Sequence, residues 1–192
     1  SHRMVTKQVS FYEEMTNVPF IIAGPGIHPR QKPVEDLLTQ PTIDLLPTLC
    51  ELAGIPVPSS KPGISLAPFL KGEKQKRQHP YAASEWHSEY EVTVSPGRMI
   101  RSPRYKYTHY LEGNGEELYD MLKDKGERRN LAHDPKYSKI LAEHRALLDD
   151  YIRRTQDDYR SLKVEADKRW RSHAPGYPNH EGPCARDIIN RK

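Results

Sequence analysis

Lys7 is the residue of this chain whose type and surroundings best suit chemistry on an anion. It is an isolated cation just upstream of an aromatic and acidic cluster, Phe11-Tyr12-Glu13-Glu14. An ammonium group is a compact point charge that can hold an oxyanion while a bond to it breaks. Taken alone, Lys7 is better explained as an ordinary surface lysine, so a functional role for it depends on the surrounding sequence.

Histidines supply the other candidates. His87 follows Trp86 at the end of an expected strand, and it reads either as a loop histidine or as a substrate contact. His173, His180 and Cys184 would make an incomplete zinc set, because a structural zinc site uses four ligands. The sequence has no phosphate-binding glycine loop, HExxH, paired CxxC or GxSxG motif. It therefore predicts no resident metal and no nucleophile within the chain.

Composition favours a folded chain with a modest core. Only 35% of the 192 residues are hydrophobic, and 17 prolines indicate long ordered loops. The net charge of +4 comes from 30 basic and 26 acidic residues spread along the sequence, which is typical of a solvated surface and not of a nucleic-acid-binding block. No apolar run approaches the ~20 residues that a membrane span requires. We expect neither a nucleic-acid partner nor a membrane span.

The first part of the chain predicts one strand and two helical segments. Val18 to Ala23 is an apolar run that stops at a Gly-Pro-Gly turn, which is typical of a strand buried on both faces of a parallel sheet. Its neighbours are not in this sequence, so we expect the chain to be the C-terminal part of something larger. Leucines at helical spacing predict a helix over 45–53, with Pro47 near its first turn, and 65–70 allows one further helical turn.

After the charged run 73–79 the pattern changes to that of strands. Strands are expected at 81–86, 99–101, 105–111 and 117–120. Asp134 can then cap a helix whose apolar stripe runs to Ile152. The simplest packing is a four-stranded antiparallel sheet covered by a helix. Past Thr155 the pattern dissolves into charged and Pro/Gly-rich sequence, which predicts an extended tail.

Five segments occur in an order that adds to these patterns: SHRMVTKxxxFYEExxxVPFIIAGPGI, PTIDLLPTLCELAGIPVP, SLAPFL-KG, RMIRSPRYKYTHY and ELYDMLKDKGERRNLAHDP. Together they resemble the C-terminal part of a type I, formylglycine-dependent sulfatase of the alkaline phosphatase superfamily, from Ser1 to about Asp158. The resemblance implies an α/β fold. Residues 1–72 would complete the catalytic α/β sheet domain, 73–158 would form the antiparallel sheet and helix subdomain, and 159–192 would be the tail.

The resemblance also implies roles for individual residues. Lys7 matches the lysine that contacts the substrate sulfate, and His2 matches a preceding position of the same loop. The family's formylglycine, made from Cys or Ser in a C/S-x-P-x-R motif, and its calcium ligands would lie upstream of this chain. Neither Cys50 nor Cys184 begins such a motif. The expected activity is hydrolysis of a sulfate ester or sulfamate of a carbohydrate or aryl compound, in a periplasmic or secreted enzyme, with this chain inactive alone.

Two alternatives remain open at this point. The same superfamily contains phosphonate and phosphate ester hydrolases with related C-terminal sequences. The chain could instead be a non-catalytic basic module that binds sulfated polysaccharide, which steeply salt-dependent binding to heparin would reveal. As partners we expect a sulfated small molecule or glycan and the remaining N-terminal part of a sulfatase.

Overall fold

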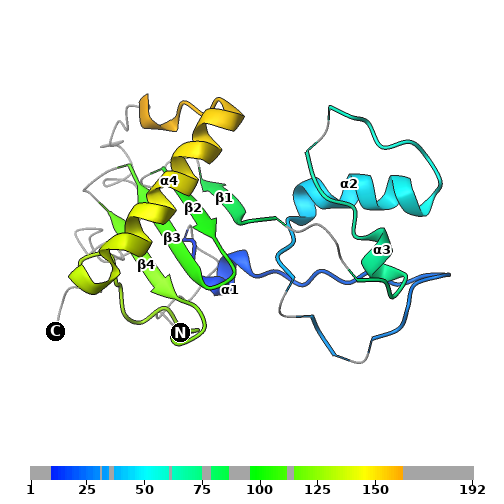
Figure 1. Ribbon diagram of the computed structural model, residues 1–192, viewed down its shortest axis with the longest axis horizontal. Coiled ribbons are helices and arrows are strands. Elements are labelled where there is room, and N and C mark those ends of the chain that lie inside the picture. Colours follow the sequence, from blue (N-terminus) through cyan, green and yellow to red (C-terminus); the bar gives the residue numbers. More distant parts are fainter. Residues whose placement is uncertain are drawn as a thin grey trace, which may run out of the picture.

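The computed structural model describes residues 10–30, 32–34, 37–60, 62–74, 79–86, 96–111 and 115–161. Figure 1 shows two lobes, a larger one built on a sheet and a smaller helical one. The elements are α1 (Glu13–Thr16), α2 (Pro41–Leu52), α3 (Ala67–Leu70), β1 (Ala82–Trp86), β2 (Gly97–Arg101), β3 (Tyr105–Tyr110), β4 (Glu116–Asp120) and α4 (Ser138–Thr155), with single 3-10 turns at Pro135–Tyr137 and Tyr159–Ser161. The predicted sheet and covering helix are confirmed.

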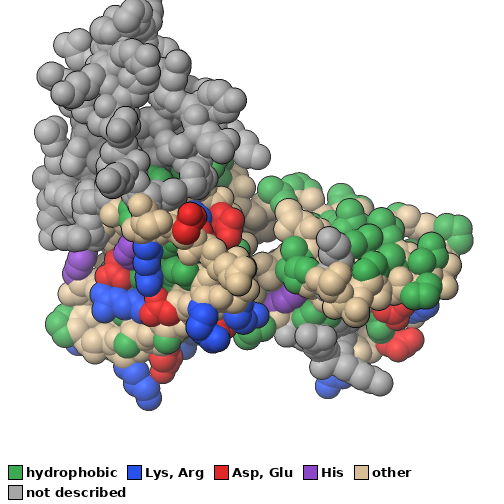
Figure 2. Space-filling model, turned by 90° about the horizontal axis from the view of Figure 1, so that it is seen from above, with side chains coloured by type: hydrophobic (Ala, Val, Ile, Leu, Met, Phe, Trp, Pro, Cys, Tyr) green, Lys and Arg blue, Asp and Glu red, His purple; other side chains and the backbone are tan. Residues whose placement is uncertain are grey.

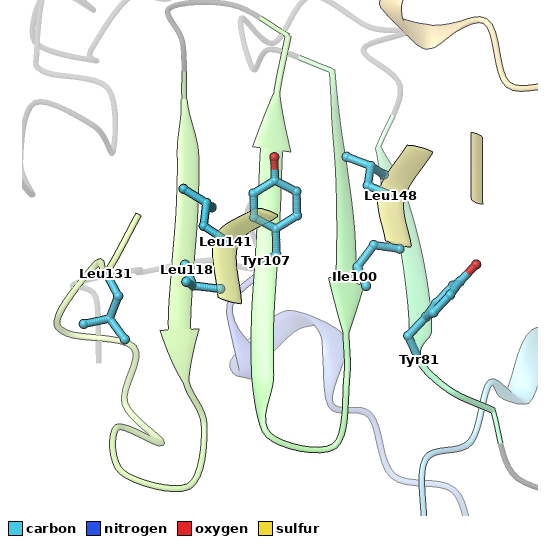
Figure 3. Close-up of a cluster of buried hydrophobic side chains, with 7 residues drawn as sticks. All are labelled: Tyr81, Ile100, Tyr107, Leu118, Leu131, Leu141 and Leu148. Atoms are coloured by element: carbon cyan, nitrogen blue, oxygen red, sulfur yellow. The ribbon is translucent and has the colours of Figure 1, made fainter. Parts of the chain in front are cut away.

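The sheet is an antiparallel meander in the order β1-β2-β3-β4. Its register places Ile100 opposite Tyr107 and Tyr107 opposite Leu118, so these side chains share one face. Leu141 and Leu148 of α4 pack against them and close the main core (Figure 3). This packing explains the alternation in the strands and the 3.6-residue stripe in the helix, because each pattern places its apolar side chains toward the other.

Helix α4 ends in a turn that brings the chain back onto the sheet. Its C-terminal cap, Gln156, has left-handed backbone geometry with φ of 55°, and its N–H donates to the carbonyl of Ile152. The chain then delivers Tyr159 to a fully buried position, where its hydroxyl lies 2.7 Å from Nδ1 of His109. Residues 159–161, expected to begin the extended tail, thus belong to the folded body. The rest of that predicted tail lies outside the described residues.

Side-chain amides form hydrogen bonds with backbone groups of both outer strands of the sheet. At β4, Oδ1 of Asn130 accepts from the N–H of Leu118 at 3.0 Å, and Nδ2 donates to the carbonyl of Glu116 at 2.9 Å. At β1, Oε1 of Gln40 accepts from the N–H of Ala83 at 2.9 Å. These bonds satisfy edge groups that would otherwise face outward.

The smaller lobe departs from the expected position of Pro47. This proline lies inside α2 and not in its first turn. Proline has no N–H, so it cannot bond the carbonyl of Ile43 one turn earlier. The backbone of Gly63, at φ of 117°, lies directly against that carbonyl oxygen, and a side chain there would collide with it. The interruption in the helix is thus the place where the following loop docks.

The strand expected over Val18–Ala23 is not formed. The segment has no regular structure, and Ile21 is 87% exposed. A strand that is apolar on both faces needs neighbours on both sides, and none of the described strands lies in a sheet with it. Within the described part of the chain, no helix is both long and apolar enough to cross a membrane.

Candidate functional site

The three residues predicted to contact substrate, Lys7, His2 and His87, lie outside the described residues. The structure does show the segments that border two of them. Phe11 lies four residues after Lys7, and Trp86 directly precedes His87. Among the residues that the structure describes, Phe11 and Trp86 are therefore the buried or strand-bound ones nearest in the sequence to Lys7 and His87.

The segment that follows Lys7 is held on the face of the sheet opposite α4. Phe11 and Tyr12 are both buried. The ring of Phe11 lies 5.8 Å from that of Tyr110, and the ring of Tyr12 lies 6.4 Å from that of Tyr119. Two consecutive aromatic residues thus cover the second face of the sheet. Burial raises the pKa values of these tyrosine hydroxyls, so they stay neutral.

A buried lysine from the middle of the sheet fastens the same segment. Nζ of Lys106 lies 2.8 Å from the carbonyl oxygen of Phe11, 2.8 Å from Oε1 of Glu13 and 2.7 Å from Oε1 of Glu127. Its side chain is only 1% exposed. An ammonium group has three N–H donors, and three acceptors surround it here. These acceptors come from the N-terminal segment and from the turn after β4, so Lys106 joins three distant parts of the chain.

The charges of this cluster balance. Arg101 lies 3.8 Å from Glu13, and the N–H of Glu13 donates to Oε2 of Glu127 at 2.7 Å. Two cations and two carboxylates therefore share one partly dry region. Burial raises the pKa of Glu127 against the opposing effect of Lys106, and burial lowers the pKa of Arg101. Buried charges are tolerated when they are paired and hydrogen-bonded in this way.

The strand that leads to His87 ends beside Phe11, whose carbonyl oxygen Lys106 binds. We call Lys106, Glu13 and Glu127 the anchor of the N-terminal segment. Trp86 is the register partner of Gly97, which places their Cα atoms about 5 Å apart. A Cβ atom on Gly97 would lie 2.7 Å from the Phe11 ring, so Phe11 and Trp86 flank one glycine. The two segments that continue toward Lys7 and His87 therefore border the same end of the sheet.

The smaller lobe is organised by a buried acid. The carboxylate of Asp44 accepts from the N–H groups of Gln40 and Ile64, at 2.7 and 2.8 Å, and lies 2.7 Å from Nε2 of His79. Asp44 is fully buried. It therefore ties α2 to the following loop and to the segment that enters β1.

An apolar face is left open on this lobe. Figure 2 shows hydrophobic side chains gathered over it. The exposed large side chains of this lobe include Leu45, Leu46 and Leu49 of α2, with Ile55 and Val57 just after it. We call these five residues the α2 face. An exposed apolar patch rimmed by polar residues marks an interaction surface in soluble proteins.

Among the residues that the structure describes, no group of three or more His, Cys, Asp or Glu side chains could hold a metal ion. The family resemblance places the calcium ligands upstream of this chain.

Comparison with known proteins identifies the family. The sequence profile described as "N-sulphoglucosamine sulphohydrolase, C-terminal" matches residues 1–154. The chain belongs to this sulfatase family. The expectation that it is the C-terminal part of a sulfatase is confirmed, and the antiparallel sheet with its helix is the C-terminal subdomain of that fold.

Three matches illustrate the similarity. A Delta 4,5-hexuronate-2-O-sulfatase of Bacteroides thetaiotaomicron is 77% identical over all 192 residues, which make up 40% of that protein. The solved structure of a 2-O GAG sulfatase matches 98% of this chain and 41% of its own, at 77% identity and a TM-score of 0.85. A structure in complex with its substrate D-glucosamine-2-N,6-O-disulfate matches 62% of this chain and 25% of its own, at 27% identity and a TM-score of 0.56. The chain spans about two fifths of the curated relative that it matches over its whole length.

Sequence patterns did not single out the anchor of this sulfatase segment. Lys106 alternates with Tyr105 and Tyr107 along a strand, and a lysine in such a pattern is ordinarily placed on a solvated face. The available signal was its neighbours on that face, Thr108 and Tyr110, which suit a partly buried surface better than a wet one. Glu127 carried no signal, because nothing local shows that a turn carboxylate points beneath a sheet.

Proposed function

We propose that this chain is the C-terminal part of a sulfatase that hydrolyses the 2-O-sulfate of a Delta 4,5-unsaturated hexuronate. The observation that carries the proposal is 77% identity over the full 192 residues to a Delta 4,5-hexuronate-2-O-sulfatase. At this identity, the anchor residues and the segments that lead to Lys7 and His87 are expected to keep their arrangement. The sulfated glycan is therefore the expected substrate class.

Lys7 is proposed as the residue that binds the sulfate. A sulfate ester carries a compact negative charge, which must be stabilised while an attacking oxygen displaces the alcohol. An ammonium suits this task as a point charge. Four peptide units separate Lys7 from Phe11, so its Cα atom lies at most about 14 Å from the anchored Phe11. This reach supports a site near the end of the sheet where Phe11 and Trp86 flank Gly97.

His2 and His87 are proposed as further substrate contacts. His87 is one residue from Trp86 and hence within about 4 Å, Cα to Cα, of the same end of the sheet. Formylglycine would supply the attacking oxygen and calcium would neutralise sulfate oxygens, and both are assigned to the remainder of the sulfatase. The same remainder is the proposed occupant of the α2 face. Because the formylglycine and the calcium ligands are assigned to that remainder, the 192-residue chain assayed alone should release no sulfate.

The test uses the complete sulfatase that contains this chain. Sulfate release from a Delta 4,5-hexuronate-2-O-sulfate is compared with turnover of an aryl sulfate and of a phosphonate monoester. Lys7→Ala should lower kcat/KM for the sulfated hexuronate by ~10²-fold or more. Lys7→Arg should restore only part of the activity, because a planar guanidinium does not replace a compact ammonium.

Lys123→Ala provides the control, since Lys123 is an exposed lysine in the turn after β4. It should leave kcat/KM unchanged. Preference for the phosphonate monoester would overturn the proposed substrate class in favour of the related hydrolases. Equal activity of the Lys7→Ala and Lys123→Ala enzymes would remove Lys7 from the site.

A further inference from the structure

Lys106 is chemically costly for a position in the middle of a sheet. Moving an ammonium out of water costs free energy, and its ion pairs recover this cost only with good geometry. An apolar residue of similar length would often stabilise such a position as well or better. The cluster is therefore better explained by the structural position that it fixes than by the stability that it adds. What it specifies is the position of one short segment, Phe11 to Glu13, relative to β3.

The geometry of the cluster fixes that segment in register. Lys106 binds the carbonyl of Phe11 and the side chain of Glu13, and Glu127 binds the N–H of Glu13. Contacts to two adjacent backbone groups and one side chain cannot all survive a shift of one residue.

Glu127 gives an independent sign that the arrangement is selected. It is a non-glycine residue with φ of 49°, and its side chain is 1% exposed. A left-handed backbone is unfavourable for a residue with a side chain, and it persists where the surrounding structure holds it in place. Here it directs the carboxylate beneath the sheet onto Lys106 and the N–H of Glu13.

We propose that Lys106, together with Glu13 and Glu127, is a positioning residue that sets where Lys7 stands relative to the sulfate. This rests on the proposed function, in which Lys7 binds the sulfate. Lys106 does not touch the substrate in this proposal. It acts by holding the chain four residues downstream of Lys7, because an error in the position of that segment is passed on to a contact that depends on sub-ångström placement.

A double-mutant cycle in the complete sulfatase tests the coupling. Lys106→Met keeps the length of the side chain and removes its three donors. In the Lys7-containing enzyme it should lower kcat/KM for the 2-O-sulfated hexuronate by about 10-fold or more. In a Lys7→Ala background the same substitution should cost less than roughly 2-fold, because there is no longer an ammonium to misplace. Glu127→Gln should show the same coupling at a smaller size.

Leu148→Ala is the control for a purely structural effect. Leu148 is fully buried in the core on the opposite face of the sheet. It should lower the melting temperature, and any loss of activity should be the same in both Lys7 backgrounds. Should Lys106→Met fail to fold, the milder Glu127→Gln carries the cycle.

The outcomes separate the two proposals. If Lys106→Met and Glu127→Gln cost the same factor with and without Lys7, or cost nothing, the positioning role is overturned while the proposed function stands. If Lys7→Ala itself leaves kcat/KM unchanged, the role of Lys7 and this inference both fall. Coupling to Lys7 in the Lys106 and Glu127 variants, with none for Leu148→Ala, supports the proposal.

Discussion

The ring of Phe11 lies so close to Gly97 that a methyl group on this glycine would come within 2.7 Å of it. Tyr110 lies on the other side, at 2.9 Å from the same point. The glycine is therefore required by the two rings that cover it, and not by its own backbone conformation. It creates the recess into which the N-terminal segment docks.

Gly97→Ala should destabilise the sulfatase by ~1–3 kcal/mol, the usual cost of forcing an extra methyl group into a packed site. Phe11→Leu in the same chain should reduce that cost, because the smaller side chain vacates part of the space. The free energy of unfolding in urea measures both. Gly126→Ala is the matched control, since its nearest neighbour would be at an ordinary 3.7 Å. Equal stability of the two alanine variants would contradict the close contact.

Asp44→Ala should destabilise the smaller lobe more strongly than the loss of one small side chain suggests. The substitution leaves the buried N–H of Ile64 and the N–H of Gln40 without their acceptor, at ~1–3 kcal/mol for each unsatisfied group. Limited proteolysis around residues 62–66, followed by urea unfolding, would detect the loss. Asp44→Asn keeps one acceptor oxygen and should be cut more slowly than Asp44→Ala. Identical proteolysis of all three proteins would show that the loop is held by other contacts.

His144 predicts a loss of stability in mild acid. Its Nδ1 donates to the carbonyl of Ile140, its Nε2 lies 2.9 Å from the hydroxyl of Ser102, and burial lowers its pKa below the ordinary value. In the unfolded chain the ring takes up a proton near pH 6.5. Below that pH the unfolded state binds more protons than the folded state, so stability falls as pH falls.

His144→Gln should flatten the difference in melting temperature between pH 7.5 and 5.5, because glutamine does not titrate. His133→Gln, at an exposed position, should leave the difference as it is. A profile that His144→Gln does not change would assign the acid sensitivity elsewhere, for instance to His109, whose pKa burial also lowers.

The α2 face should be covered in the complete sulfatase. Leu49, which is 50% exposed here, becomes a buried position in that case, and Leu49→Glu would place an unpaired charge in an interface. We expect a melting temperature several degrees lower and a rise in binding of a hydrophobic dye. Leu122→Glu is the control on the other lobe, where Leu122 is 66% exposed. If neither variant differs from the parent, the α2 face is open to solvent in the complete protein.

The elements with strong local patterns could be predicted from the sequence. The stripe from Tyr137 to Ile152 predicted α4, and alternation predicted the four strands, because each needs only information within ten or so residues. Asp134, which was expected to cap that helix, instead caps the 3-10 turn Pro135–Tyr137 that precedes α4. Val18–Ala23 shows the limit of that reasoning. Its composition indicates a buried strand, but a strand forms only where partner strands exist.

The anchor could not be predicted for a related reason. Lys106 and Phe11 are 95 residues apart in the sequence, and their contact depends on how the finished sheet is covered. The roles of Lys7 and His2 stay predictions from the family resemblance, and that of His87 stays a prediction from its position after Trp86.

The carboxamides of Asn130 and Gln40 have a consequence for how copies of this sulfatase segment could associate. Each occupies main-chain groups that an incoming strand would need, at Leu118 on one side and at Ala83 on the other. Another molecule would have to displace them before it could extend the sheet, so edge-to-edge growth into filaments is disfavoured at both ends. The proposed cover of the α2 face would instead bind through side chains, and it would leave both edges of the sheet as they are.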